Sequence, residues 1–155
     1  MRRLGLLIAT CGYVGFAPVA PGTAGSAAGL VVFYLVQASG FPWAQALAIA
    51  ALFAAGVWAA SITEKALGRT DPPAVVIDEV VGMLITLAWI PVTPLGALVG
   101  FLIFRVFDVI KPWPSRQFEA LHGGLGVMAD DAMAAVYGNL LLRGLVLVAP
   151  AGWLV

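Results

Sequence analysis

Apolar residues fill five long stretches of the chain, and these stretches predict helices that cross a membrane. Residues 43 to 63 form the clearest one, because about 20 consecutive apolar residues span the hydrocarbon core. The shorter stretches cover residues 26 to 40, 74 to 90, 95 to 110 and 131 to 148. We expect an all-α fold, a compact polytopic membrane helix bundle of about five short or tilted spans. It would form a single membrane-embedded domain over residues 1–155.

The N-terminal segment differs from these stretches. Residues 4 to 16 are apolar but too few to span comfortably, and Pro18, Pro21 and Gly22 interrupt any helix there. We therefore expect this segment to lie at the membrane interface or to re-enter the bundle.

Composition supports the membrane interpretation. The chain is 62% hydrophobic and only 10% charged, and residues 4 to 63 and 80 to 104 contain no Asp, Glu, Lys or Arg. A soluble domain could not cover its surface from such stretches. Eight basic residues balance eight acidic ones, which argues against a nucleic-acid partner. The single cysteine, Cys11, excludes an internal disulfide bond and a structural zinc site.

Connections that carry Lys or Arg alternate with connections that carry none, which we call the tips. This pattern predicts the orientation of the chain in the membrane. Lys and Arg residues precede the first apolar stretch and follow the second and fourth spans. No Lys or Arg occurs in the tips at residues 39 to 43 and 91 to 94 or in the C-terminal tail. The positive-inside rule then puts the N-terminus in the cytoplasm and the C-terminus outside. Arg143 is the exception, because it lies inside the last span, where it must snorkel, pair or face protein.

In this arrangement the carboxylates all fall at the cytoplasmic end. They are Glu64, Asp71, Asp78, Glu79, Asp108, Glu119, Asp130 and Asp131. Charge held within spanning segments is costly, so a functional site is the default interpretation. Asp78 and Glu79 are predicted about one turn inside the third span, although a solvated helix start would also favour acidic residues. Asp71, in a turn, is expected to cap the helix that follows.

Basic and acidic residues lie together at the end of the fourth span. Arg105, Asp108 and Lys111 recur at three-residue spacing, which keeps them on one side of a helix. They form either a polar stripe that faces the bundle or an ion pair followed by a snorkelling lysine. Pro112 and Pro114 end this helix, and an interfacial segment follows.

Two further groups suit a metal ion and a phosphate. Asp130 and Asp131 follow a pliable glycine-rich loop at the start of the last span, where they could bind Mg²⁺ or simply cap the helix. Residues 20 to 26 combine Pro and Gly with Thr23 or Ser26 as a helix cap, and the amides of a helix start bind anions.

Together these groups predict metal-assisted removal of a phosphate from a lipid headgroup, by direct attack of a metal-activated water. A thiol phosphatase loop is absent, because Ala17 stands where an Arg would follow Cys11. The expected metal ligands are Asp78, Glu79, Asp108, Asp130 and Asp131. The expected phosphate contacts are Gly22, Thr23, Ser26, Arg105, Lys111 and Arg116. His122 could protonate the departing oxygen, although a lone loop histidine is more often a bystander.

Four segments, APGTAGS, IDEVVGMLIT, FRVFDVIKPWPSRQFE and HGGLGVMADD, occur in this order along the chain. They resemble the motifs of the bacterial phosphatidylglycerophosphatase A family, and the resemblance extends from about Gly12 to Tyr137. It implies an Mg²⁺-dependent, multi-pass enzyme of the inner membrane that removes the terminal phosphate of phosphatidylglycerol phosphate to give phosphatidylglycerol. Ala135 departs from the family pattern, which usually has Gly there.

Two other hypotheses stay open from the sequence. A phosphatidyltransferase acting at the same face would carry a D-G-x-x-A-R signature, which the chain lacks. A non-enzymatic channel or scaffold would spread its charges through the bilayer depth, whereas here the outer tips lack them. Asp130→Asn would leave such a protein functional but silence a metal phosphatase. A homo-oligomer is compatible with each of these hypotheses.

Overall fold

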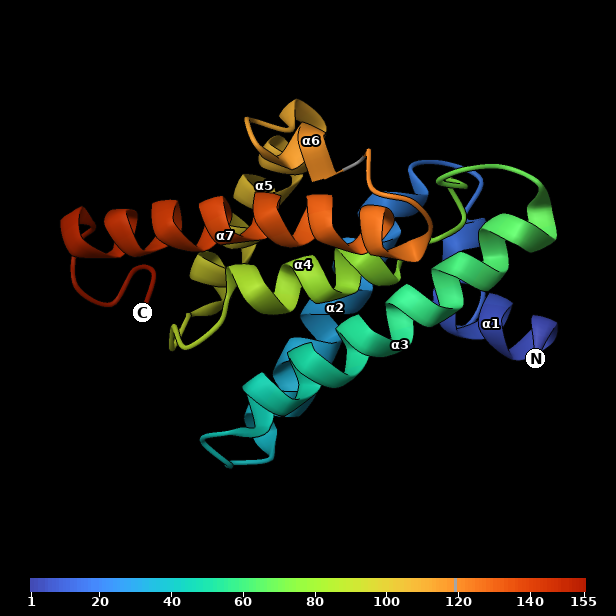
Figure 1. Cartoon of the computed structure of the whole chain (residues 1–155). Coiled ribbons are helices and arrows are strands. Elements are labelled where there is room, and N and C mark those ends of the chain that lie inside the picture. The colour runs from blue at the N-terminus through green and yellow to red at the C-terminus, as the bar shows by residue number, and fades with distance from the viewer. Residues whose placement is uncertain (119) are drawn as a thin grey trace.

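The computed structural model describes residues 1–118 and 120–155, and its regular elements are helices (Figure 1). They are α1 (Arg2–Ala9), the 3-10 helix η1 (Val14–Phe16), α2 (Pro21–Ala38), α3 (Ala44–Leu67), α4 (Ile77–Thr86), α5 (Pro94–Ile110), α6 (Ser115–Phe118) and α7 (Gly124–Val148). The residues described contain no strand. The prediction of an all-α fold is therefore confirmed.

Helix α4 is the centre of the bundle. It packs against α2, α3, α5 and α7, and Figure 1 shows α7 lying alongside it. Its Met83 belongs to an apolar cluster with Phe33 of α2 and Phe104 of α5. Its Val81 belongs to a second apolar cluster with Met128 of α7. Because one short helix contributes to both clusters, it holds the other helices in fixed positions around it.

Local sequence explains where several helices begin and end. Pro21 and Pro94 stand in the first turns of α2 and α5, where a missing backbone N–H costs nothing. Thr93 caps α5, because its Oγ1 accepts a hydrogen bond from the Gly96 N–H at 3.1 Å. Gly68 ends α3 in the left-handed region, at φ 64°.

Two helices are long and apolar enough to cross a membrane within the described part of the chain. They are α3, with 24 residues, and α7, with 25 residues. Helix α4 has only 10 residues, and at about 1.5 Å per residue it covers about half of the hydrocarbon core. The stretch over residues 74 to 90 therefore contains one helix, as predicted, but the helix is shorter than the stretch. The number of spans stays a prediction.

Large apolar side chains are exposed on the outer faces of the long helices. Examples are Leu35 on α2, Leu47 on α3, Leu102 on α5 and Leu147 on α7, which are 68%, 58%, 54% and 86% exposed. A soluble monomer rarely exposes so much apolar surface. These faces suit contact with lipid.

The start of α7 differs from the prediction. The helix begins at Gly124, so Asp130 and Asp131 lie almost two turns inside it rather than at its start. Gly124 and Gly126, expected in a pliable loop, are helical residues. A Cβ on Gly124 would overlap the Val57 carbonyl oxygen, so the missing side chain lets α7 approach α3 closely.

The predicted helix caps also need correction. Helix α2 has Ala20 as its N-cap, so neither Thr23 nor Ser26 caps it. Helix α4 has Val76 as its N-cap, so Asp71 does not cap it. Asp78 and Glu79 consequently lie in the first turn of α4, not one turn inside it.

The predicted interfacial or re-entrant segment is divided into two helices. Helix α1 packs against α3, and η1 packs against α2. The segment is therefore part of the bundle, while its depth in the membrane stays a prediction.

Arg143 is exposed, but its side chain is hydrogen-bonded to other groups of the protein. Its Nε donates to Asn139 Oδ1 at 2.8 Å, and its Nη2 donates to the Ala88 carbonyl at 2.9 Å. Asn139 Nδ2 in turn contacts the carbonyls of Ile85, Thr86 and Ala88 at 3.1, 3.0 and 3.2 Å. These side chains of α7 satisfy carbonyls at the C-terminal end of α4 and so fix the two helices together.

The close contact between α3 and α7 can be tested with two glycines of one helix. Gly124→Ala is expected to destabilise the fold by about 1–3 kcal/mol, because the new methyl group meets backbone atoms of α3. At Gly144, also in α7, a Cβ would meet no described atom within 4 Å. Gly144→Ala should therefore leave stability unchanged or raise it by up to about 1 kcal/mol. Thermal unfolding in detergent measures both variants, and equal melting temperatures would contradict the packing.

Candidate active site

A cavity of about 390 Å³ lies where α2 and α4 begin, and charged groups line it. The N-terminus of α2, the segment before α4, the end of α5 and the first part of α7 all contribute. Its ionisable lining comprises Arg69, Asp71, Asp78, Glu79, Arg105, Asp108, Lys111, Asp130 and Asp131. Six carboxylates against three cations leave a formal excess of negative charge. Such a cavity attracts a cation.

Three of these carboxylates form a compact set. Asp78, Glu79 and Asp131 each offer an oxygen, and these oxygens all lie within 4.8 Å of one another. The Oε2 atom of Glu79 is buried and has no hydrogen-bond partner among the described residues. A buried carboxylate oxygen without a partner is costly, and a divalent cation that prefers oxygen ligands would satisfy it. The three residues therefore fit a hard divalent metal ion.

The other two predicted metal ligands are engaged in ion pairs. Asp108 Oδ2 lies 2.6 Å from Arg105 Nη1, and Asp130 Oδ2 lies 2.5 Å from Lys111 Nζ. Asp108 is also close enough to Asp131 for the two carboxyl groups to interact. The structure thus divides the predicted set of five ligands into a group of three and two ion-paired neighbours.

Helix geometry explains why the adjacent residues Asp130 and Asp131 have different partners. In each acidic pair the first carboxylate accepts the backbone N–H of the second residue, at 3.1 Å from Glu79 to Asp78 and 2.9 Å from Asp131 to Asp130. Adjacent helix positions point about 100° apart. Asp131 therefore reaches toward α4, while Asp130 reaches Lys111 at the end of α5.

Arg105 links α5 to both α4 and α2. Its Nη1 lies 3.7 Å from Glu79 Oε1 and 3.5 Å from Ser26 Oγ, which itself donates to the Gly22 carbonyl at 2.9 Å. The close approach of α2 to Glu79 and Arg105 requires a glycine at position 22. A Cβ there would overlap Glu79 Oε1 and lie 3.0 Å from Arg105 Nη1. Any side chain at this position would push the carboxylate and the guanidinium apart.

Four predicted site residues do not line the cavity. Thr23, Arg116 and His122 are exposed, and none of them lines it. Ser26 is buried behind Arg105 and does not line it either. Glu119, one of the carboxylates expected at this end, lies outside the described residues.

Arg69 lines the cavity although it was not among the predicted site residues. It stands two residues before Asp71, in the segment between α3 and α4. The sequence signal that could have identified Arg69 is its position two residues before Asp71 in a polar turn.

Cys11 is not suited to nucleophilic chemistry. Burial, with a smaller contribution from the Glu79 carboxylate, raises the pKa of the Cys11 thiol to about 12. Because the thiolate is the reactive form, this residue stays unreactive near neutral pH. The result agrees with the absence of a thiol phosphatase motif.

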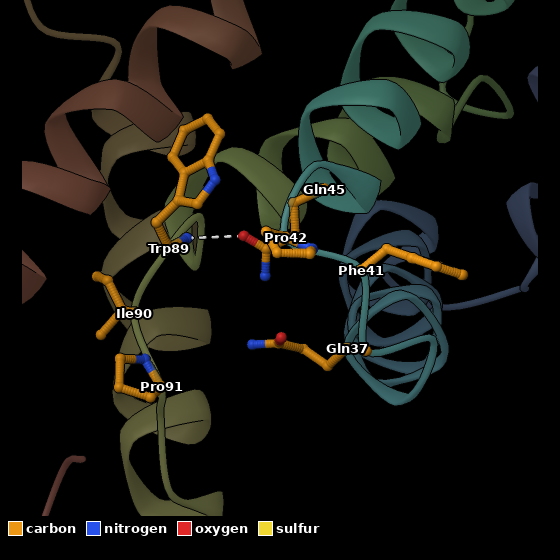
Figure 2. Close-up of a pocket in the computed structure, with 8 residues that line it drawn as sticks. Gln37, Phe41, Pro42, Gln45, Trp89, Ile90 and Pro91 are labelled. Atoms are coloured by element: carbon orange, nitrogen blue, oxygen red, sulfur yellow. Dashed lines mark hydrogen bonds between the residues drawn. The ribbon is translucent and has the colours of Figure 1, made fainter.

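A different hollow, of about 370 Å³, lies between the α2–α3 connection and the segment after α4 (Figure 2). Gln37, Gln45 and Trp89 are among its lining residues, and the backbone N–H of Trp89 donates to Gln45 Oε1 at 2.8 Å. Among the described residues, no ionisable side chain lines it. It therefore lacks groups for acid–base catalysis or metal binding, and the acidic cavity is the better candidate.

Comparison with known proteins identifies close relatives of this chain. The family model described as phosphatidylglycerophosphatase A matches residues 7–146. A phosphatidylglycerophosphatase A of Escherichia coli is 39% identical, covering 79% of this chain and 72% of its own length. The Haemophilus influenzae protein of the same name is 38% identical, covering 76% of this chain and 74% of its own length.

A further relative carries a different name. A Bacteroides thetaiotaomicron protein, provisionally named as a phosphatidylinositol-3-phosphatase, is 36% identical and covers 98% of this chain and 96% of its own length. No solved structure matches this chain.

The division between metal-facing and ion-paired acids can be tested by titration. Asp131→Asn is expected to weaken Mn²⁺ binding by tenfold or more, because it removes one of three clustered ligands. Asp130→Asn should weaken binding much less, because its carboxylate faces Lys111. Free Mn²⁺ is followed by electron paramagnetic resonance on the detergent-solubilised chain. A larger loss for Asp130→Asn would overturn this division.

Proposed function

Since the chain belongs to the phosphatidylglycerophosphatase A family and is a phosphatase, we propose that it hydrolyses the terminal phosphate of phosphatidylglycerol phosphate. The product is phosphatidylglycerol, and the reaction uses Mg²⁺ at the cytoplasmic face of the bacterial inner membrane. The observation that carries the proposal is the cavity itself, where three clustered carboxylates lie beside two ion-paired cations.

Asp78, Glu79 and Asp131 would hold the metal ion, with Asp108 and Asp130 beside them. When bound, a divalent cation neutralises phosphate oxygens and activates the attacking water. The carboxylates by themselves would repel a phosphate dianion, because they outnumber the cations of the cavity. This charge balance favours a metal-dependent reaction over one that relies on side chains alone.

Arg105 and Lys111 would bind the phosphate that leaves. Their ion pairs with Asp108 and Asp130 hold the two cationic groups at the cavity wall. A guanidinium carries five N–H donors, so Arg105 can pair with Asp108 and still contact a phosphate. Ser26 would act through Arg105, whose Nη1 lies 3.5 Å from its hydroxyl oxygen.

The start of α2 would add backbone donors. Gly22 lines the cavity, and the first N–H groups of a helix have no partner within it. The backbone N–H groups of Gly22 and Thr23 therefore suit phosphate oxygens, whereas the exposed Thr23 side chain does not take part. Arg116 and His122 do not line the cavity and receive no role.

We also propose that the bundle crosses the membrane about five times with this cavity on the cytoplasmic side. The 10-residue α4 would make its crossing together with the non-helical residues that flank it. Two candidate spans, α3 and α7, and the exposed apolar faces support insertion. The ionisable cavity at one end and the uncharged hollow near Trp89 support the orientation. Charged side chains belong at the wet face, and uncharged tips cross a membrane more readily.

A phosphoinositide is the second candidate substrate, because of the name of the Bacteroides relative. Both lipids carry a phosphate monoester on a polyol that a phosphodiester joins to diacylglycerol. The cavity chemistry is the same for either, so a comparison of substrates has to decide between them.

Inorganic phosphate release from phosphatidylglycerol phosphate in mixed micelles tests the proposed function. We expect turnover that a chelator abolishes and Mg²⁺ restores, and a loss of about a hundredfold or more in kcat for Asp131→Asn. Phosphatidylinositol 3-phosphate is assayed in parallel. A higher kcat/KM on that lipid would replace the proposed substrate, and turnover that persists without metal would refute the metal-dependent mechanism.

Cys11→Ala provides a test of the nucleophile. The variant should release phosphate at a rate within about twofold of the parent chain, because a thiol with so high a pKa is not used in the reaction. The same phosphate assay measures it at neutral pH. Loss of turnover in a variant whose melting temperature is unchanged would point to a covalent thiol mechanism instead.

A further inference from the structure

A second hollow borders the acidic cavity. It has a volume of about 330 Å³, and Glu64 and Thr70 are among its lining residues. Arg69, Asp71 and Asp130 line both hollows, so they form the wall that the two share. Arg69 and Asp71, in the segment between α3 and α4, are exposed, so this part of the wall lies at the rim of the acidic cavity.

Arg69 differs from the other two cations of the cavity. Arg105 and Lys111 are partly buried and form ion pairs with carboxylates. Arg69 is exposed, and the ion pairs found among the described residues do not include its guanidinium. Its backbone N–H donates to the Glu64 carbonyl at 3.3 Å, which ties the main chain to the end of α3. The guanidinium is therefore an exposed cation on an anchored stretch of backbone, and it can meet an anion from outside.

The proposed substrate carries two phosphates with different fates. The terminal monoester is cleaved, and the phosphodiester between the headgroup and diacylglycerol remains. The inner cations, Arg105 and Lys111, lie beside the clustered acids and suit the phosphate that is cleaved. A second cation at the rim suits the phosphate that is kept, because an arginine binds phosphate oxygens in a bidentate manner.

We propose that Arg69 binds the uncleaved phosphodiester of the lipid and so selects substrates that carry a second phosphate. This inference rests on the proposed function. It predicts that the enzyme prefers a lipid whose monoester is separated from the glycerolipid by a phosphodiester-linked polyol. Phosphatidic acid, which has a monoester but no phosphodiester, would gain nothing from Arg69.

The test compares Arg69→Ala with Lys65→Ala on two substrates. Lys65 is an exposed cation in the last turn of α3 that does not line the cavity, so it controls for general electrostatic attraction. For Arg69→Ala we expect kcat/KM on phosphatidylglycerol phosphate to fall about tenfold, mainly through KM. Activity on phosphatidic acid should not change, and Arg69→Lys should recover part of the loss because it keeps the charge.

Three outcomes would overturn the inference. An equal loss on both lipids would place Arg69 at the cleaved phosphate. An unchanged kcat/KM on phosphatidylglycerol phosphate would remove Arg69 from substrate binding. The same loss in Lys65→Ala would show only a general effect of positive charge.

A binding measurement separates this inference from the proposed function. Phosphatidylglycerol carries the phosphodiester alone, and isothermal titration of a short-chain form into the detergent-solubilised full chain needs no turnover. Arg69→Ala should weaken its binding about tenfold, whereas Lys65→Ala should not. Absence of turnover on phosphatidylglycerol phosphate would sink the proposed function, while equal affinity of parent and Arg69→Ala chains would sink the role of Arg69.

Discussion

The burial of carboxylates among apolar helices is the constraint on which this structure depends. Asp78 and Asp131 are only 7% and 4% exposed, so water cannot stabilise their charge. A buried charge persists only with an opposite charge nearby. Lys111 supplies that charge to Asp130, and Arg105 supplies it to Asp108 and, at 3.7 Å, to Glu79 Oε1. Asp78, Asp131 and the buried Oε2 of Glu79 are left for a metal ion. The same arrangement that makes burial tolerable creates a site for a cation and a phosphate.

Helix α4 turns this constraint into a fixed geometry. Its first turn carries two of the clustered acids, and Asn139 of α7 holds its last carbonyls. Arg143 of α7 holds the Ala88 carbonyl just after the helix. Since α7 also carries Asp131, the contacts at one end of α4 set the spacing of the acids at the other end. A helix too short to cross the bilayer by itself is therefore useful here, because both of its ends lie inside the bundle.

Close helix contacts bring the remaining groups to the same place. Gly29 packs against Met83, and Gly22 packs against Glu79 and Arg105, so α2 approaches α4 along its length. The approach puts the N-terminal amides of α2 beside the acids of α4. The chemistry of the cavity and the packing of the bundle therefore have one cause, which is the absence of side chains at these glycines.

Much of the candidate site could be read from the sequence, because charge is so rare in this chain that the spacing of Arg105, Asp108 and Lys111 and the two acidic pairs stand out. The apolar stretches likewise determined that the fold is helical. The direction of each side chain and the ends of each helix could not be read in this way. Thr23 directly follows the cavity residue Gly22 but is exposed, since a helix start can turn a side chain away within one residue. His122, in the loop before α7, is exposed as well. Only the tertiary structure decided that Asp131 joins Asp78 while Asp130 joins Lys111, because that choice depends on how α7 is rotated against α4 and α5.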